Sequence, residues 1–254
     1  MIAFLTDWGN SHYVGVCKGV IDKIAPNTKV VDFTHEIEPF DVRMAAHIIG
    51  RYYKDFPKGT IFLCVVDAEV GTSNKRLAIK TDDYYFVGPD YGLFTFIDKI
   101  ETIVELSNKK YFYKKSYTFH GRDIFSPAAA YLSKGEKIKN LGKEIKELKT
   151  IEFSKPKIIN NIDSLGSTTI EVEVAFIDRF GNIELFCKED EIPFSEKYFI
   201  DRTIIHRTST FAQNDFNIHT DSSGYLEIAK FQGRANDFFK FKSGDIINLT
   251  IKNS

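Results

Sequence analysis

Residues 2–33 read IAFLTDWGNSHYVGVCKGVIDKIAPNTKVVDF and predict a strand, a helix and a second strand in succession. The apolar run Ile2–Thr6 is closed by the polar residues of a turn. Residues Tyr13–Ala25 then carry apolar side chains at helical spacing, and Pro26 ends that pattern. A β-branched run follows over Lys29–Phe33. Because strands alternating with helices pack as a parallel sheet covered by helices, this stretch predicts an α/β domain.

The alternation continues to about residue 150. Asp41 is a suitable N-cap for a helix that ends before Pro57, and Thr60–Val66 reads as a buried strand. Further strands are expected at Leu77–Lys80, Tyr84–Val87 and Thr102–Leu106, and a further helix at Phe125–Leu132. We therefore expect an N-terminal α/β sheet domain over residues 1–150.

The pattern changes after Lys149. Residues 151–165 are polar and are expected to form a linker. From Thr168 apolar and polar residues alternate, as a half-buried strand requires, and later runs such as Tyr225–Ala229 are short strands between Gly-containing turns. We expect a smaller, C-terminal all-β domain over residues 166–254.

Composition excludes several classes of protein. The 254 residues include 34 Lys and Arg against 35 Asp and Glu, whereas nucleic-acid-binding domains show a basic excess. No apolar run approaches the roughly 18 residues needed to span a bilayer. The three cysteines, Cys17, Cys64 and Cys187, are scattered and form no disulfide framework or zinc motif. A cytoplasmic protein that binds neither nucleic acid nor membrane is expected.

Several polar residues follow expected strands, where ligands bind in open α/β sheets. Asp7 follows the first strand and can accept hydrogen bonds from a ribose diol, or can simply cap a turn. Asp67 follows Thr60–Val66, where a functional role competes with that of a turn residue. His120 lies in FHGRD at residues 119–123, where a structural role competes with a catalytic one.

Two turns of the second domain present similar alternatives. The segment that starts at Asp178, DRFGN, reads as a β-turn or as a ligand contact, and the turn at Ser222 reads as a hairpin or an anion-binding turn. The histidines show no metal-ligand spacing, and no dinucleotide, Walker A or serine-hydrolase motif is present.

These motifs occur together, and in this order, in one known family. The matching segments are TDWG (6–9), YVG (13–15), KG (18–19), VDFTH (31–35), FPKGT (56–60), VVD (65–67), PD (89–90), FHGRDIF (119–125), PAAA (127–130), DRFGN (178–182) and SSGYLEIA (222–229). The chain resembles the S-adenosylmethionine hydroxide adenosyltransferases, which are relatives of the fluorinase and chlorinase.

The resemblance implies a fold, an assembly and a reaction. It implies an α/β N-terminal domain, a barrel-like C-terminal β domain and a homotrimer whose active sites lie at subunit interfaces. The implied reaction is displacement of L-methionine from C5′ of S-adenosyl-L-methionine by water, which yields adenosine. No metal and no cofactor are implied, because the sulfonium is already a good leaving group.

The resemblance also implies three catalytic residues: a carboxylate at Asp67, an Arg, and His120. Two residues compete for the Arg position. Without a gap Asn74 occupies it, whereas a slightly longer loop places Arg76 there. We favour Arg76, because the following LAI then pairs with the family's strand.

Substrate contacts carry over one residue at a time. Asp7 matches the carboxylate that holds the ribose diol, and Phe40 matches an aromatic residue near the ribose. Asp178 and Ser222 match groups that bind the methionine amine and carboxylate. The adenine contacts are matched by Phe180, Asn182, Phe211 and, through its backbone, Gln232.

The presence of Asp67 favours water over halide as the nucleophile, because halide displacement requires a pocket without a competing negative charge. We therefore expect an S-adenosyl-L-methionine hydrolase. The alternatives are a halogenase of the chlorinase type and a protein that binds S-adenosylmethionine or adenosine without catalysis.

Overall fold

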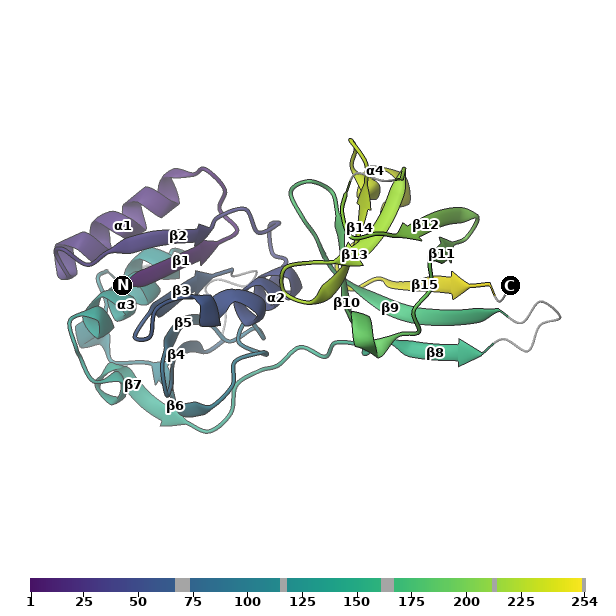
Figure 1. Ribbon diagram of the computed structural model, residues 1–254. Helices are drawn as coiled ribbons and strands as arrows, with labels where there is room; N and C mark the ends of the chain where they lie inside the picture. Colours follow the sequence, from purple (N-terminus) through teal and green to yellow (C-terminus); the bar gives the residue numbers. More distant parts are fainter. Residues whose placement is uncertain (67–73, 115–117, 161–166, 212–213, 253–254) are drawn as a thin grey trace. The chain divides into compact units, whose positions relative to one another are not determined.

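The computed structural model describes residues 1–66, 74–114, 118–160, 167–211 and 214–252. The chain divides into two compact units, Met1–Ile151 and Glu152–Ser254 (Figure 1). The mixed α/β class, with a sheet domain followed by a β-barrel, confirms the fold expected from the sequence.

The N-terminal unit is built on one sheet with strand order β2-β1-β3-β5-β4-β6-β7. The strands are β1 (Ile2–Thr6), β2 (Val30–Thr34), β3 (Ile61–Val65), β4 (Arg76–Thr81), β5 (Tyr85–Pro89), β6 (Ile100–Leu106) and β7 (Gly142–Ile145). The helices are α1 (His12–Ile24), α2 (Val42–Tyr52) and α3 (Ser126–Ser133), with 3₁₀ turns at Tyr53–Asp55, Lys109–Tyr111 and Ile138–Leu141 and a π-helical turn at Gly121–Phe125.

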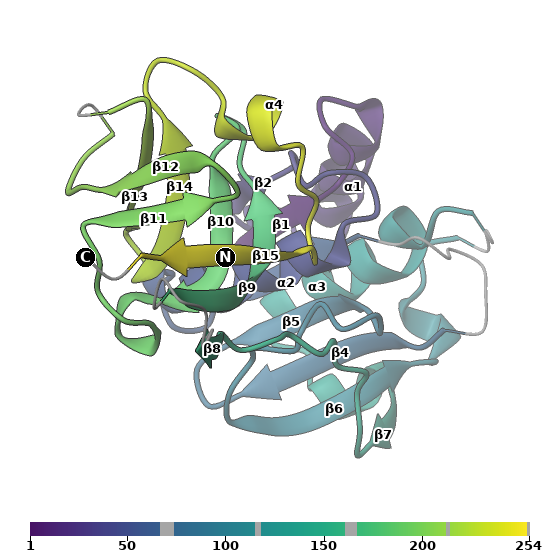
Figure 2. The same ribbon diagram turned by 90° about the vertical axis from the view of Figure 1, so that its right-hand side faces the viewer.

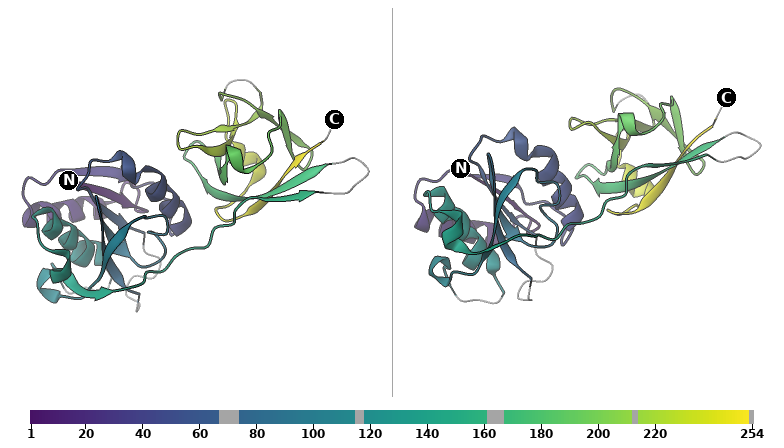
Figure 3. Two further views of the ribbon diagram at one scale, coloured as in Figure 1. Left: turned by 60° about the horizontal axis from the view of Figure 1, so that its bottom comes forward. Right: turned by 90° about the horizontal axis from the view of Figure 1, so that it is seen from below.

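Helices cover both faces of this sheet (Figure 3). Residues of α1 and α3 share one buried cluster with Ile2 and Phe4 of β1. The aromatic rings of Phe62 and Phe86 stack on the opposite face, beside the C-terminal end of α2. Because both faces are covered, every residue of β1 and β3 is buried, which explains their uninterrupted apolar sequences.

Local signals placed the helices correctly. The carboxylate of Asp41 caps α2 by accepting a hydrogen bond from the backbone N–H of Met44 at 2.8 Å. Ser11 caps α1 in the same way. Pro127 lies in the first turn of α3, where the missing N–H costs no hydrogen bond.

The sheet is parallel only in part. Strands β2, β1, β3 and β5 are parallel, whereas β4 runs antiparallel to both β5 and β6. The expectation of a parallel sheet is wrong for this half. Residues 82–84 alone connect β4 to β5, and a parallel crossover needs a dozen residues or more.

The C-terminal unit is a closed barrel of seven strands with an eighth strand added at one edge (Figure 2). Its elements are β8 (Lys157–Asn160), β9 (Thr168–Ile177), β10 (Ile183–Lys188), β11 (Lys197–Ile200), β12 (Thr203–Arg207), β13 (Phe216–Thr220), β14 (Tyr225–Lys230), β15 (Ile246–Ile251), the 3₁₀ turn Glu189–Glu191 and the short helix α4 (Ala235–Phe239). The pairing of β9 with β10 closes the barrel around an apolar core.

One segment differs from the expected linker at residues 151–165. Within it, Lys157–Asn160 forms β8, which pairs with the first part of β9. Strand β9 is ten residues long and β10 pairs only with its second part. The remaining backbone groups of β9 form their hydrogen bonds with β8. The polar sequence of residues 157–160 does not reveal that β9 needs this partner.

Candidate active site

The carboxyl-terminal edge of the parallel strands collects most of the N-terminal site residues. Asp7 follows β1, His35 follows β2 and Asp90 follows β5. Because β4 is antiparallel, its first residue, Arg76, pairs with Pro89 and lies at the same edge. Asp67 follows β3 in sequence and lies outside the described residues.

Asp7 and Phe40 are brought together at this edge. The Oδ2 atom of Asp7 accepts a hydrogen bond from the backbone N–H of Phe40 at 2.9 Å. Burial raises the pKa of the Asp7 carboxyl, and the bond from Phe40 opposes that rise. Phe40 is 64% exposed and has a φ of 68°, which residues other than glycine rarely adopt. An exposed aromatic ring held in a costly conformation beside a carboxylate is the arrangement expected of a ligand contact.

His120 is buried at the start of the π-helical turn that leads into α3. Burial lowers the pKa of its imidazole, and the charge of Arg76 lowers this pKa further, against the opposing effect of Asp123. The neighbouring Gly121 is required by packing, since a Cβ there would lie 2.5 Å from the ring of Trp8. The lowered pKa of His120 favours the neutral form of its ring.

Arg122 and Asp123 of the same motif bond to each other. The guanidinium donates to both carboxylate oxygens of Asp123, at 2.7 and 2.9 Å. It also lies over the ring of Phe119. Arg122 and Asp123 therefore bind each other within the turn. His120 remains the residue of the motif whose side chain can take part in acid–base chemistry.

The two candidates for the catalytic Arg position differ in their contacts. The Nε atom of Arg76 is buried and has no hydrogen-bond partner among the described residues. The charge of Arg76 lowers the pKa of the His120 imidazole. Asn74 instead binds the hydroxyl of Tyr91, and its Oδ1 accepts from Nζ of Lys149 at 2.6 Å.

In the C-terminal unit, Asp178 and Asn182 close the turn between β9 and β10. The carboxylate of Asp178 accepts from the backbone N–H of Asn182 at 2.8 Å and from its side-chain Nδ2 at 3.1 Å. Phe180 at the tip of this turn is 73% exposed. Gly181 has a φ of 80° and a Cβ there would lie 2.6 Å from Arg234, so the turn requires glycine.

Gln232 and Phe211 belong to the same end of the barrel as this turn. Gln232 follows β14 directly, with a φ of 51°. The carbonyl of Phe211 accepts from Nδ2 of Asn217, which pairs with Ala229 near the end of β14. The exposed ring of Phe211 packs edge-on against His219, with centroids 4.3 Å apart. The four residues expected at adenine, Phe180, Asn182, Phe211 and Gln232, are thus grouped.

Ser222 lies elsewhere. It is exposed in the turn between β13 and β14, and the six residues of β14 separate it from Gln232, a span of roughly 20 Å. The antiparallel pairing of Ile183 with Ile228 puts the Asp178 turn at the opposite end of β14. The structure therefore does not bring Asp178 and Ser222 together, although both were expected to bind the methionine moiety.

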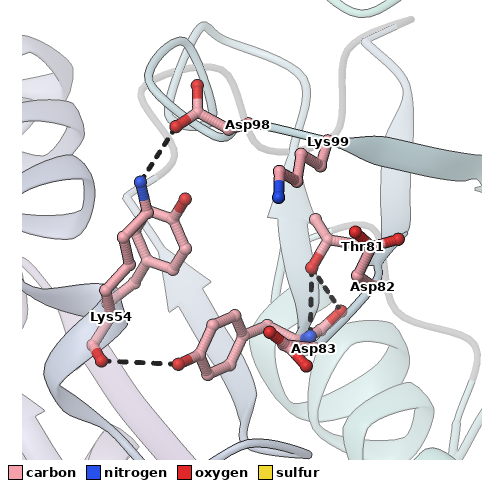
Figure 4. A pocket seen from close by; sticks show the side chains of 8 residues that line it. Lys54, Thr81, Asp82, Asp83, Asp98 and Lys99 are labelled. Atoms are coloured by element: carbon pink, nitrogen blue, oxygen red, sulfur yellow. Dashed lines mark hydrogen bonds and ion pairs between the residues drawn. The ribbon is translucent and has the colours of Figure 1, made fainter.

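Two of the hollows in the described part of the N-terminal unit lie at opposite edges of the sheet. One, of about 340 Å³, lies at the carboxyl edge and is lined by Asn74, Lys75, Asp90, Glu147, Leu148 and Lys149. The other, of about 290 Å³, lies at the opposite edge, where Lys54 pairs with Asp98 at 3.0 Å and Thr81 bonds the backbone of Tyr84 (Figure 4). No predicted site residue lines this second hollow.

Within the part of the chain that the structure describes, no group of three or more His, Cys, Asp or Glu side chains is arranged to hold a metal ion. None of the described helices combines the length and apolar character needed to cross a membrane. The cysteines Cys17, Cys64 and Cys187 are buried free thiols.

Comparison with known proteins identifies the family of this chain. Residues 2–142 match the SAM hydroxide adenosyltransferase N-terminal domain, and residues 172–248 match the corresponding C-terminal domain. The chain belongs to the SAM hydroxide adenosyltransferase family. Each of these two matches falls within one of the two compact units.

Several relatives match this chain along nearly its whole length. The (R)-S-adenosyl-L-methionine hydrolase of Salinispora tropica is 32% identical, over 98% of this chain and 97% of its own. The protein of the same name from Methanocaldococcus jannaschii is also 32% identical, over 98% and 95%. The crystal structure of an uncharacterized conserved protein from Thermotoga maritima has a TM-score of 0.85 and 39% identity, covering 98% of this chain and 99% of that one.

Sequence reasoning missed one polar network of the N-terminal unit. Thr6, Lys18, Asp32 and His35 lie next to Asp7 and are connected by hydrogen bonds. The available signal was Asp32, a carboxylate inside a β-branched run, where a polar residue needs a partner.

Proposed function

We propose that this chain is an S-adenosyl-L-methionine hydrolase that forms adenosine and L-methionine. The observation that carries the proposal is Arg76, which lies at the carboxyl edge opposite Pro89, whose buried Nε has no hydrogen-bond partner among the described residues, and whose charge lowers the pKa of His120. Support also comes from the relatives named (R)-S-adenosyl-L-methionine hydrolase, which span the whole chain at about one-third identity.

The proposed reaction is a single displacement. A water oxygen forms a bond to C5′ while the C5′–S bond breaks, and the sulfur keeps the electron pair and becomes the neutral thioether of methionine. The water proton passes to the carboxylate of Asp67 and then to solvent. Arg76 and neutral His120 orient the water and stabilise the charge that develops on Asp67 and the attacking oxygen.

We assign a part of the substrate to each group of candidate residues. We assign the ribose to Asp7 and Phe40, and the methionine carboxylate to Ser222. Adenine is assigned to Phe180, Asn182, Phe211 and the backbone of Gln232. Because the Asp178 carboxylate holds Asn182, we propose that Asp178 orients this amide rather than binding the methionine amine.

The proposed reaction needs no metal or cofactor. The leaving group departs as a neutral thioether, so neither acid catalysis nor a Lewis acid is required at sulfur. We further propose a cytoplasmic homotrimer with active sites at subunit interfaces, by resemblance to the family. Activity that survives dialysis against EDTA, and a trimer mass in sedimentation equilibrium, are the expected results.

Product identification tests the proposed function. Purified protein is incubated with S-adenosyl-L-methionine in H₂¹⁸O, with and without chloride, and the products are analysed by mass spectrometry. We expect equal amounts of adenosine and L-methionine, with ¹⁸O in the adenosine alone, because water attacks C5′. A chlorinated nucleoside would identify a halogenase, and calorimetric binding without products would identify a binding protein; either result contradicts hydrolysis.

The pKa of His120 tests whether Arg76 lies beside its imidazole, and this test does not depend on turnover. Because burial and Arg76 lower its pKa, the ring should titrate below the ordinary value of 6.5 in NMR spectra of the free enzyme. Because the unfolded chain protonates His120 more readily than the folded chain does, this group contributes to stability above pH 6.5. That contribution is lost as the pH falls through the lowered pKa. Replacing Arg76 by Gln should move the pKa of His120 upward. An unchanged pKa would show that the two side chains are not neighbours.

A further inference from the structure

Two loops at the carboxyl edge carry the proposed ribose contacts, and they are joined at both ends. The turn after β1 contains Asp7, and the loop after β2 contains Phe40. The Asp7 carboxylate accepts from the N–H of Phe40 at 2.9 Å. At the other end, the N–H of Gly9 donates to the carbonyl of His35 at 2.8 Å. The relative position of these loops therefore sets the ribose site.

The imidazole of His35 connects the same two segments through side chains. Its Nδ1 lies 2.9 Å from Oγ1 of Thr6, and its Nε2 lies 3.0 Å from Oδ1 of Asp32. Asp32 is also bound by Nζ of Lys18 at 2.7 Å. The ring packs edge-on against Phe4, and the side chain is only 12% exposed. His35 is thus held by Thr6 and Phe4 of β1 and by Asp32 of β2, and Lys18 of α1 holds Asp32 in turn.

The hydrogen bonds in this network have a defined direction. Partial burial raises the pKa of Asp32, but the bonds from Lys18 and His35 outweigh it and lower that pKa overall, so the carboxylate is ionised and only accepts. The Nε2 of His35, which faces this carboxylate, is then the donor of that bond, and in the tautomer with one proton on Nε2 the Nδ1 atom accepts from the hydroxyl of Thr6. The Thr6 oxygen in turn accepts from the N–H of Trp8 at 3.2 Å.

The order Asp32, His35, Thr6 has the geometry of an acid, a base and a nucleophile, but burial excludes that role. Thr6 has no exposed surface, and its hydroxyl points to His35. The network therefore acts on the turn that follows. It fixes Thr6 and Trp8, the two residues that flank Asp7 in sequence.

The conformation of Phe40 shows why such support is needed. A left-handed, non-glycine residue costs roughly 1 kcal/mol or more and persists only where its surroundings enforce it. The bond from its N–H to Asp7 is one restraint, and it works only if Asp7 is itself held in place.

We propose that His35 is the positioning residue of the ribose site, joining the turn that carries Asp7 to the loop that carries Phe40. This inference rests on the proposed function. Because the proposed reaction assigns the attacking water to Asp67, Arg76 and His120, we expect loss of the network to weaken ribose binding and to leave the chemical step largely intact.

Paired substitutions at Thr6 and His35 test the proposal. Thr6→Val removes the hydroxyl at equal volume, and His35→Gln removes the contact to Thr6. Each should raise KM for S-adenosyl-L-methionine by about ten-fold with kcat within about three-fold, since a buried polar group loses its partner. Thr6→Ser keeps the hydroxyl and should restore KM. His12→Gln, a substitution of an exposed histidine on α1, is the control and should leave both constants unchanged.

Binding of adenosine, measured by calorimetry, separates this inference from the proposed function. If the wild-type protein binds adenosine without hydrolysing S-adenosyl-L-methionine, hydrolysis is wrong but the ten-fold loss of adenosine affinity still tests His35. Unchanged KM and adenosine affinity in well-folded Thr6→Val and His35→Gln proteins would overturn the inference. A fall in kcat alone would also overturn it, because it would place the network in the chemical step.

Discussion

Replacing Asp67 by Asn is expected to lower kcat by about 10²- to 10⁴-fold, the usual contribution of a positioned general base. Asn has the same shape as Asp and keeps a hydrogen-bonding oxygen, but it cannot take the proton from the attacking water. Calorimetry should therefore show S-adenosyl-L-methionine binding with little change while product formation almost stops. The measurement is single-turnover formation of adenosine, followed by mass spectrometry.

Glu69 is the matched control for this experiment, since it is the other carboxylate of the same loop sequence. Glu69→Gln should keep kcat within about three-fold, because the resemblance assigns it no chemical role. If Glu69→Gln stops the reaction and Asp67→Asn does not, the base is Glu69. If both variants stay active, proton transfer to a carboxylate is not part of the mechanism.

Replacing Arg76 by Gln is expected to lower kcat by about 10²- to 10³-fold, the effect of removing one preorganised donor at a developing charge. Its Nε is buried without a partner in the described part of the chain, which is the state of a donor held for a ligand or transition state. Arg76→Lys should also be poorly active, because an ammonium lacks the planar, forked donors of a guanidinium.

Asn74→Ala provides the comparison for Arg76. Asn74 already binds Tyr91 and Lys149, so its removal should change kcat by less than about three-fold. Steady-state kinetics of both variants decide the assignment. A larger loss in Asn74→Ala than in Arg76→Gln would give the position to Asn74 and contradict the geometry described above.

Local sequence patterns predicted much of this fold. The apolar runs of β1 and β3, the helical spacing of α1 and the cap at Asp41 each act within a few residues, and each appears where it was expected. The motifs also indicated Asp7, Phe40 and His120 as site candidates. Short-range patterns are reliable here because backbone hydrogen bonding and side-chain periodicity are properties of the segment itself.

Other features depended on partners that are distant in the sequence. Strand β8 exists because half of β9 lacked a neighbour, and β4 runs antiparallel because its connection to β5 is short. Likewise, the pairing of β10 with β14 places Ser222 far from Asp178. No local pattern predicts which strands pair or in which direction, because the pairing depends on a partner strand that is distant in the sequence.

The sequence by itself indicated the family, the two-domain organisation and the candidate residues of the site. Only the tertiary structure shows that Asn74 has hydrogen-bond partners across the sheet edge whereas Nε of Arg76 has none among the described residues, because these contacts depend on residues distant in the sequence. The same holds for His35, whose role appears only when Thr6, 29 residues away, lies against its ring. The physical reason is common to both cases: hydrogen bonds and buried charges are satisfied in space, and spacing along the chain does not reveal them.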